Sequence, residues 1–170
     1  MEEIVWQGRF ITAKRDGKWE YVSRARNIEA AVILAVDEGH VLLVEQYRVP
    51  LGARCLELPA GLVGDERDGE TVLTAAAREL EEETGYRAAR ITPVGRFASS
   101  PGMISETFTL ARAEGLTRVG DGGGIEDEQI VVHRVPLSEV SQFVAGRQAA
   151  GAVLDVKLLL LLGGTILAGQ

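Results

Sequence analysis

Four of the six residues at positions 78–83 are glutamates, in the order Arg-Glu-Leu-Glu-Glu-Glu. On an α-helix, which turns about 100° per residue, Glu79, Glu82 and Glu83 share one face. Each like-charged pair four residues apart destabilises a helix by about 0.2–0.5 kcal/mol. A bound cation would remove this cost, and Mg²⁺ prefers oxygen ligands such as carboxylates. These residues alone leave two interpretations open, a solvated acidic face or a metal site.

The stretch that holds the glutamates reads as one helix between two end signals. Thr71 is suited to the N-cap, and Gly85 stands where a left-handed C-terminal cap belongs. Glu81 points away from the other glutamates, so we expect it to take no part in a site. An apolar stripe for packing is predicted at Leu73, Ala76, Ala77, Leu80 and Thr84.

The spacing across residues 64–86 is that of the Nudix box, G-x5-E-x7-R-E-U-x-E-E-x-G-U, in which U is apolar or aromatic. All the fixed positions are filled, beginning with Gly64 and Glu70. The chain therefore resembles a Nudix hydrolase. The resemblance implies a loop–helix–loop that holds Mg²⁺ or Mn²⁺ and cleaves a diphosphate linked to another group. It implies metal binding by Glu79, Glu82 and Glu83, a catalytic part for Glu82, and an orienting ion pair from Arg78 to a carboxylate.

Three stretches outside the box are similar to the ADP-ribose pyrophosphatase branch of the family. The first, residues 57–61, resembles the E-x-P-A-G segment of that branch, in which the alanine carbonyl is a metal ligand. Ala60 is therefore expected to bind the metal, and Glu57 to face the substrate. In most relatives Gly61 would itself be the first glycine of the box. Here Gly64 restores the count, so the sequence carries a three-residue insertion.

The second stretch is the loop at residues 99–106. Pro101 follows Gly85 by 16 residues, the spacing that marks the ADP-ribose branch, and Gly102 completes its S-P-G sequence. Glu106 resembles a residue that accepts a hydrogen bond from the terminal ribose. We therefore expect Pro101, Gly102 and Glu106 in the substrate site.

The third stretch is the acidic segment at residues 124–128. It resembles the loop that supplies a catalytic glutamate and a further metal contact. From its alignment before Ile130 we assign Glu126 as the general base and Glu128 as a metal contact. An exchange of these roles stays open, because glutamates two apart on a loop can replace each other.

Two arginines before the box could meet an anionic substrate, since a guanidinium is suited to bidentate phosphate contacts. For Arg48 a surface position and a phosphate contact are equally expected, and for Arg54 the surface position is favoured. Both are kept as substrate-binding candidates. Trp19 is a further candidate, available to stack on adenine.

Hydrophobic patterns elsewhere predict an α/β protein. Asp16-Gly17 is a type I′ hairpin signal between strands at 10–14 and 18–22, and a second hairpin is expected from strands at 30–36 and 41–47. Further strands are expected at 91–97, 107–111 and 130–135, helices at 137–145 and 155–162, and a flexible connector at 120–124. These elements predict a mixed sheet between helices. The resemblance implies the same fold, a Nudix-type α/β/α sandwich with an N-terminal antiparallel hairpin.

Length and composition restrict the class of protein. The 170 residues are expected to form a single Nudix domain over residues 1–170, and the family branch implies a homodimer with residues 1–28 at its interface. A net charge of −7 without basic runs argues against nucleic-acid partners. One cysteine, Cys55, fits a reducing compartment. Neither a signal sequence nor an apolar run of membrane-spanning length is evident, so we expect a soluble cytoplasmic protein.

The resemblance implies hydrolysis of ADP-ribose to AMP and ribose 5-phosphate. Two alternatives remain open. One is a Nudix pyrophosphatase for another nucleoside diphosphate sugar, such as GDP-mannose. The other is a non-catalytic ADP-ribose sensor, which would normally show an eroded box or an appended DNA-binding domain, and this sequence has neither.

Overall fold

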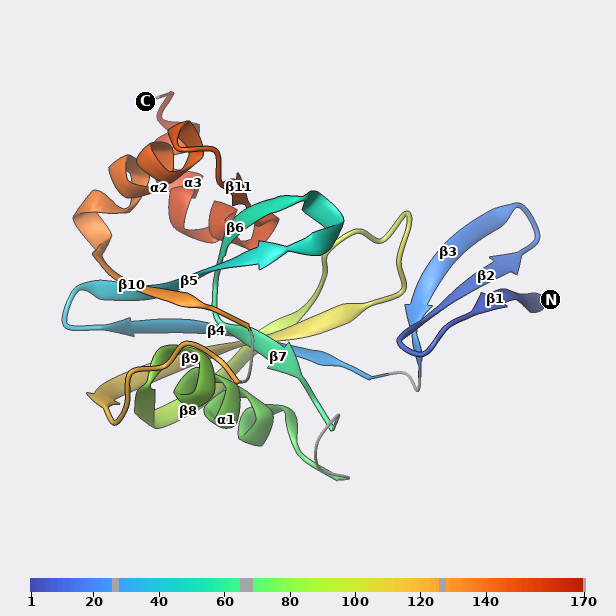
Figure 1. The fold of residues 1–170 in the computed structure, drawn as a ribbon, viewed down its shortest axis with the longest axis horizontal. Coiled ribbons are helices and arrows are strands. Elements are labelled where there is room, and N and C mark those ends of the chain that lie inside the picture. Colours follow the sequence, from blue (N-terminus) through green and yellow to red (C-terminus); the bar gives the residue numbers. More distant parts are fainter. Residues whose placement is uncertain (26–27, 65–68, 126–127, 170) are drawn as a thin grey trace.

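The computed structural model describes residues 1–25, 28–64, 69–125 and 128–169, and shows a mixed sheet between helices with a smaller sheet beside it (Figure 1). The central sheet has the strand order β11-β6-β5-β4-β9-β8, with β10 paired to β5 and β7 paired to β4. The strands are β1 (Glu2–Gln7), β2 (Ile11–Asp16), β3 (Trp19–Arg24), β4 (Ala30–Asp37), β5 (His40–Arg48), β6 (Ala53–Glu57), β7 (Ala60–Leu62), β8 (Tyr86–Ala98), β9 (Thr107–Arg118), β10 (Val131–Pro136) and β11 (Val153–Leu154). The α-helices are α1 (Val72–Thr84), α2 (Val140–Ala149) and α3 (Leu159–Leu167), and the short 3₁₀ helices are η2 (Val49–Leu51), η3 (Leu137–Glu139) and η4 (Val156–Leu158).

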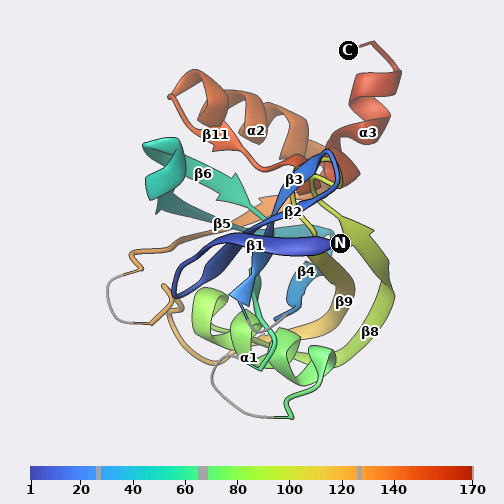
Figure 2. The same cartoon turned by 90° about the vertical axis from the view of Figure 1, so that its right-hand side faces the viewer.

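The central sheet is buried on both faces, by α1 on one side and by α2 and α3 on the other (Figure 2). Side chains alternate along β4, so Val32 enters the core beneath α2 while Ile33 enters the core beneath α1. In β5, Leu43 enters the core beneath α2 and Leu42 enters the core beneath α1. A strand buried on both faces reads as a continuous apolar run, which is the pattern expected here for 30–36. The predicted α/β/α sandwich with a mixed sheet is confirmed.

Helix α1 begins and ends where its sequence signals place it. The hydroxyl of Thr71 accepts a hydrogen bond from the Thr74 N–H, and Gly85 adopts a left-handed φ of 73°. The buried sector is wider than the predicted stripe. Ala75 and Glu83 are buried while Ala77 is exposed. β7 and the segment after β9 lie against the carboxylate face of the helix and cover it.

The strands differ from expectation mainly in length and number. β8 and β9 extend well beyond 91–97 and 107–111, and β1, β6, β7 and β11 were not expected. β8 contains Pro93, which a strand tolerates at the edge of a sheet and at a register shift, and both conditions hold here. The turn between β2 and β3 is Gly17-Lys18, and only Gly17 has a positive φ, so type I′ is wrong.

The N-terminal hairpin is a three-stranded antiparallel sheet, β1-β2-β3, which projects from the main body (Figure 1). Its attachment to the loop at 99–106 is visible in the hydrogen bonds. The Val22 N–H donates to the Met103 carbonyl, and the Ser105 N–H donates to the Val22 carbonyl, both at 2.9 Å. None of the described helices has the length and apolar character needed to cross a membrane.

Candidate active site

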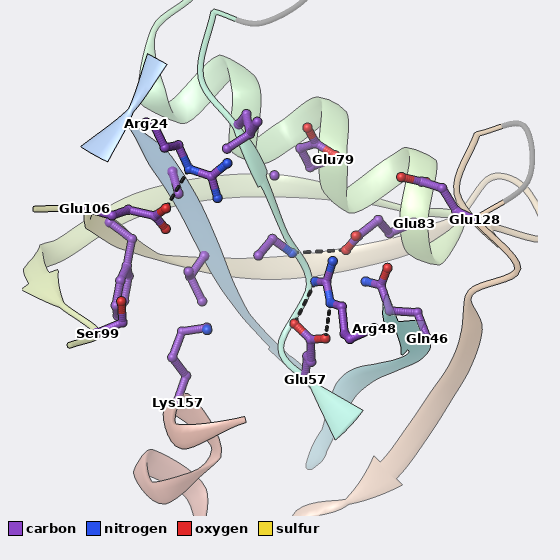
Figure 3. Close-up of a pocket in the computed structure, with 16 residues that line it drawn as sticks. Arg24, Gln46, Arg48, Glu57, Glu79, Glu83, Ser99, Glu106, Glu128 and Lys157 are labelled. Carbon is purple, nitrogen blue, oxygen red and sulfur yellow. Dashed lines mark hydrogen bonds and ion pairs between the residues drawn. The ribbon is translucent and has the colours of Figure 1, made fainter. Parts of the chain in front are cut away.

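A cavity of about 350 Å³ lies beside β7, where α1, β3 and the loop before β9 come together (Figure 3). Carboxylates of α1 face it from one side, and Arg24, Glu106 and Lys157 face it from another. Its polar lining residues are Arg24, Gln46, Arg48, Glu57, Glu79, Glu83, Ser99, Glu106, Glu128 and Lys157.

Glu83 and Glu57 are the buried carboxylates of this cavity, each with 5% of its surface exposed. Oε2 of Glu83 accepts a hydrogen bond of 3.0 Å from the Ala60 N–H. Burial raises the pKa of Glu83 to about 8; the Ala60 N–H opposes this rise, and the charges of Glu79 and Glu128 add to it. In the described part of the chain no lysine or arginine forms an ion pair with Glu83. The Arg48 guanidinium, which is paired with Glu57, lowers the pKa of Glu83, but by less than burial raises it.

Glu79 lies against the backbone of β7. A Cβ on Gly61 would stand 1.8 Å from the Glu79 carboxyl carbon, so a larger residue there would displace the Glu79 side chain. The glycine of the E-x-P-A-G segment thus keeps its place beside a box glutamate despite the insertion before Gly64. Ala60 directs its N–H to Glu83, and the metal-binding role of its carbonyl stays a prediction.

Arg78 donates hydrogen bonds to three other carboxylates of the box, those of Glu70, Glu79 and Glu82. It donates to both carboxylate oxygens of Glu70 at 3.2 Å, and its Nη1 reaches Glu79 at 2.9 Å and Glu82 at 3.0 Å. The expected orienting ion pair is confirmed, with Glu70 as the buried partner. Glu82 is on the predicted helix face, but Arg78 holds it and it does not line the cavity. Glu81 points elsewhere, as predicted, and pairs with Arg87.

Glu128 reaches the cavity from the segment between β9 and β10. Its Oε2 accepts a hydrogen bond of 2.9 Å from the Ile125 N–H. The neighbouring residue Gln129 has a φ of 50°, a left-handed conformation that residues other than glycine adopt rarely and that often marks a functional site. Glu126, our candidate base, lies outside the described residues.

Arg48 and Glu57 lie together in the cavity wall. Nε and Nη2 of Arg48 donate to the two oxygens of Glu57 at 2.6 and 2.8 Å, a bidentate pair. This contact holds the guanidinium in one orientation. The predicted substrate contacts Arg48 and Glu57 are therefore brought together by adjacent strands, β5 and β6.

Arg24 and Lys157 were not found by the sequence reasoning. Arg24 ends β3, and its Nε donates to Glu106 at 2.5 Å, so the N-terminal sheet contributes a side chain to the cavity. Lys157 lies in η4, two residues after the N-cap Asp155. Its ammonium donates to the Asp155 carboxylate at 2.7 Å and lies over the Phe108 ring, 5.7 Å from the ring centroid. Each belongs to an element far from the box in sequence, and no local motif marked it.

Other predicted site residues lie elsewhere. Arg54 donates to Glu45 at 2.9 Å and does not line the cavity. Trp19 is 60% exposed on the N-terminal sheet. Pro101 and Gly102 form an exposed turn in the loop whose flanking Ser99 and Glu106 reach the cavity. Their substrate-binding roles stay predictions.

A family model, the NUDIX domain, matches residues 25–154, more than half of the chain. This chain belongs to the Nudix family. The recognition drawn from the box is confirmed, and two glutamates of the box, Glu79 and Glu83, line the cavity.

Similar Nudix proteins carry more than one name. The chain is 38% identical to the methanol dehydrogenase activator of Bacillus methanolicus, over 67% of this chain and 60% of that protein. It is 37% identical to the ADP-ribose pyrophosphatase of Bacillus subtilis, over 72% of this chain and 65% of that protein. This chain thus spans less than two thirds of either relative. A crystal structure described as an ADP compounds hydrolase has the same fold, with a TM-score of 0.71 and 24% identity, covering 99% of this chain and 93% of that one.

The donor set of this Nudix site suits a hard divalent cation. Carboxylates and a backbone carbonyl are the ligands that Mg²⁺ and Mn²⁺ prefer. Glu83 supplies the deciding observation, since burial disfavours its charged form, no described lysine or arginine forms an ion pair with it, and Glu79 and Glu128 add to the negative potential. As they lie, no three described acidic, histidine or cysteine side chains form a ready metal cluster, and Arg78 holds Glu79 and Glu82. Binding an ion would therefore require these carboxylates to reorient toward Glu83.

Proposed function

We propose that this protein hydrolyses the diphosphate of ADP-ribose to AMP and ribose 5-phosphate, with Mg²⁺ or Mn²⁺ as cofactor. The observation that carries the proposal is the buried carboxylate of Glu83, which shares a cavity with Glu79 and Glu128 and with the Arg48–Glu57 pair. A cavity that combines carboxylates of the box with guanidinium groups held in ion pairs suits a substrate with a metal-bound diphosphate.

The metal site in this proposal consists of Glu79, Glu82, Glu83 and the Ala60 carbonyl, with Glu128 as a further contact. When bound, the cation neutralises phosphoryl oxygens and lowers the pKa of a water molecule. Arg48 has its Nε and Nη2 committed to Glu57, so its Nη1 remains for a phosphate oxygen. A carboxylate of the acidic segment, Glu126 or Glu128, accepts the proton of the attacking water.

The sugar end of the substrate is proposed to meet Glu106 and Arg24. Their ion pair offers both an acceptor and a donor, which suits the neighbouring hydroxyls of a ribose. Ser99, from the same loop as Glu106, adds a hydroxyl to this wall of the cavity.

The N-terminal sheet is proposed to form a homodimer interface. It exposes several large apolar side chains, which a monomer would leave in water. Trp19 on this sheet remains the candidate for stacking on adenine. The exposed apolar residues of this sheet are Ile4, Val5, Trp6, Phe10, Ile11 and Trp19.

We also propose that residues 1–170 form a single Nudix domain and that the protein is cytoplasmic.

A substrate panel tests this function. The purified protein is incubated with Mg²⁺ and, separately, with ADP-ribose, GDP-mannose and other nucleoside diphosphate sugars, and the products are identified by mass spectrometry. We expect the highest kcat/KM for ADP-ribose, with AMP and ribose 5-phosphate in equal amounts.

The panel also separates the alternatives. A higher kcat/KM for GDP-mannose would favour the second pyrophosphatase specificity. Saturable binding of ADP-ribose without turnover in Mg²⁺ or Mn²⁺ would favour the sensor. The names of the relatives do not decide this point, since proteins of two different names match at 38% and 37% identity.

A further inference from the structure

We propose that the glycine segment, residues 122–124, is a positioning device that fixes Glu128 relative to the carboxylates of α1. This inference rests on the proposed function, because it gives Glu128 its place in the hydrolytic site. We had expected a flexible connector at 120–124, but the hydrogen bonds of this segment attach it to the end of the helix.

The glycine segment takes up carbonyl groups that a helix end leaves free. The Gly123 N–H donates to the Glu83 carbonyl at 2.9 Å, and the Gly124 N–H donates to the Glu82 carbonyl at 3.1 Å. The last four carbonyls of any helix lack partners within the helix, so these bonds satisfy two of them. Two proposed metal ligands, Glu82 and Glu83, thus direct their carbonyls to the glycine segment.

Glycine is required at Gly122 by close approach as well as by conformation. Its φ is 68°, which is strained for other residues. A Cβ there would stand 2.4 Å from the Thr84 carbonyl carbon and 2.7 Å from the Glu83 oxygen. Both contacts are to helix backbone and cannot move aside. Any side chain at Gly122 would therefore push the segment off the helix.

The glycine segment also fixes the loop that carries Glu128. The Ile130 N–H donates to the Gly123 carbonyl at 3.1 Å, so the residue before β10 is bonded to the glycine segment. A Cβ on Gly124 would lie 2.2 Å from Oε2 of Glu128, so the carboxylate packs directly on this glycine. On the opposite side Arg54 reaches the Gln129 carbonyl at 3.4 Å.

The consequence is a short path of backbone contacts from Glu83 to Glu128. Displacement of a catalytic group by about 1 Å can lower a rate about 100-fold, so a fixed path of this kind matters for kcat. Gly122, Gly123 and Gly124 touch neither substrate nor metal in this scheme. They act through Glu128 and are positioning residues.

The first test substitutes the glycines that make close contacts. We expect Gly122→Ala and Gly124→Ala each to lower kcat by about 10- to 100-fold with KM changed less than about threefold. Gly151→Ala is the matched control: its φ is 94°, so alanine is strained there too, but a Cβ would meet nothing within 4 Å. We expect it to cost stability alone. An equal loss of kcat in Gly151→Ala would overturn the proposal.

A double-mutant cycle separates positioning from general damage. If Gly122 acts through Glu128, then Gly122→Ala should lower kcat by less than about twofold in a Glu128→Gln background. Multiplication of the two losses would show that the glycine acts independently of Glu128, and would contradict the proposal.

Amide hydrogen exchange on the unsubstituted protein needs neither substrate nor folded variants. The Gly123 and Gly124 amides should be protected to the same degree as the Gly85 amide, which bonds to the Glu81 carbonyl within the helix end. Exchange as fast as that of Gly102, in an exposed turn, would show that the attachment is absent. This result is independent of the substrate, so protected amides in a protein that hydrolyses nothing would reject the proposed function and leave the attachment in place.

Discussion

Three glutamates are buried in the described part of the chain, Glu45, Glu57 and Glu83, and two of them, Glu45 on β5 and Glu83 on α1, have opposite surroundings. Glu45 is 1% exposed and Glu83 is 5% exposed. Glu45 receives hydrogen bonds from Arg54 and Arg147, at 2.9, 2.7 and 2.6 Å, and His133 lies 3.3 Å away. Glu83 receives one backbone N–H and faces further carboxylates.

The pKa values follow this contrast. Burial alone would raise the pKa of Glu45, but hydrogen bonds from Arg147 and Arg54 outweigh it and lower the pKa. Burial raises the pKa of Glu83 to about 8, and the nearby carboxylates increase the effect. A buried carboxylate that forms ion pairs with arginines contributes to the fold, whereas a buried carboxylate without an ion pair costs stability and indicates a binding site for a cation.

The largest effect expected from this comparison is on stability. Glu45→Gln leaves Arg147 and Arg54 without their carboxylate, and breaking a buried ion pair costs about 3 kcal/mol. Urea denaturation should show this loss. Where the variant is folded, kcat should fall less than about tenfold, since Arg54 keeps its bond to the Glu45 carbonyl.

The pH dependence of this loss checks its cause. Because the folded pKa of Glu45 is lowered, its contribution is present above the unfolded value, near 4.5, and disappears as the pH falls through the folded pKa. The stability difference between wild type and Glu45→Gln should therefore shrink below about pH 4.5. A difference that stays constant down to pH 3 would contradict the ion-pair explanation.

The second effect is on turnover. Glu83→Gln and Glu82→Gln should each lower kcat by about 100-fold, because each removes a proposed metal ligand. For Glu83→Gln the free energy of unfolding should stay the same or rise, since glutamine replaces a buried carboxyl group whose charged form is disfavoured by burial. Steady-state kinetics with thermal denaturation measure both. Full activity in either variant would remove that residue from the metal set.

A smaller loss, about 10- to 100-fold, is expected for the carboxylates of the acidic segment. Glu126→Gln should lower kcat with KM nearly unchanged, and added Mg²⁺ should not restore it. Glu128→Gln should be partly restored by Mg²⁺, as expected of a metal contact. The reverse pattern of rescue would exchange the two roles.

The smallest effect is expected for Glu81→Gln. Glu81 shares the acidic run with Glu82 and Glu83 but bonds to Arg87 at the surface. Its kcat should stay within about twofold of wild type, because exposed ion pairs contribute little. A loss like that of Glu83→Gln would mean that the helix presents a different face to the cavity.

Local signals explain which parts of the fold could be predicted. Helix α1 was placed correctly because Thr71 and Gly85 act on their immediate neighbours. The extent of β8 could not be predicted, since Pro93 and Gly95 interrupt its pattern and only its edge position and register shift accommodate them.

The residues of the candidate site were likewise predictable only where a local motif marks them. The box supplied Glu79 and Glu83 from spacing alone, and β5–β6 pairing then brought Arg48 to Glu57. For Arg54 a surface position was favoured and a substrate contact kept as a candidate, because the sequence gives no sign that Glu45, within an apolar run, points inward and binds it. The cavity also needs Arg24 and Lys157, whose approach depends on how the N-terminal sheet and η4 pack.

The central claim, that Glu83 is a ligand of a divalent cation, is tested most directly by calorimetric titration with Mn²⁺ in the absence of substrate. The comparison uses wild type, Glu83→Gln and Glu81→Gln at one pH and ionic strength. We predict that Glu83→Gln weakens Mn²⁺ binding at least about tenfold while Glu81→Gln binds like wild type. Equal Mn²⁺ affinity in wild type and Glu83→Gln would contradict the account.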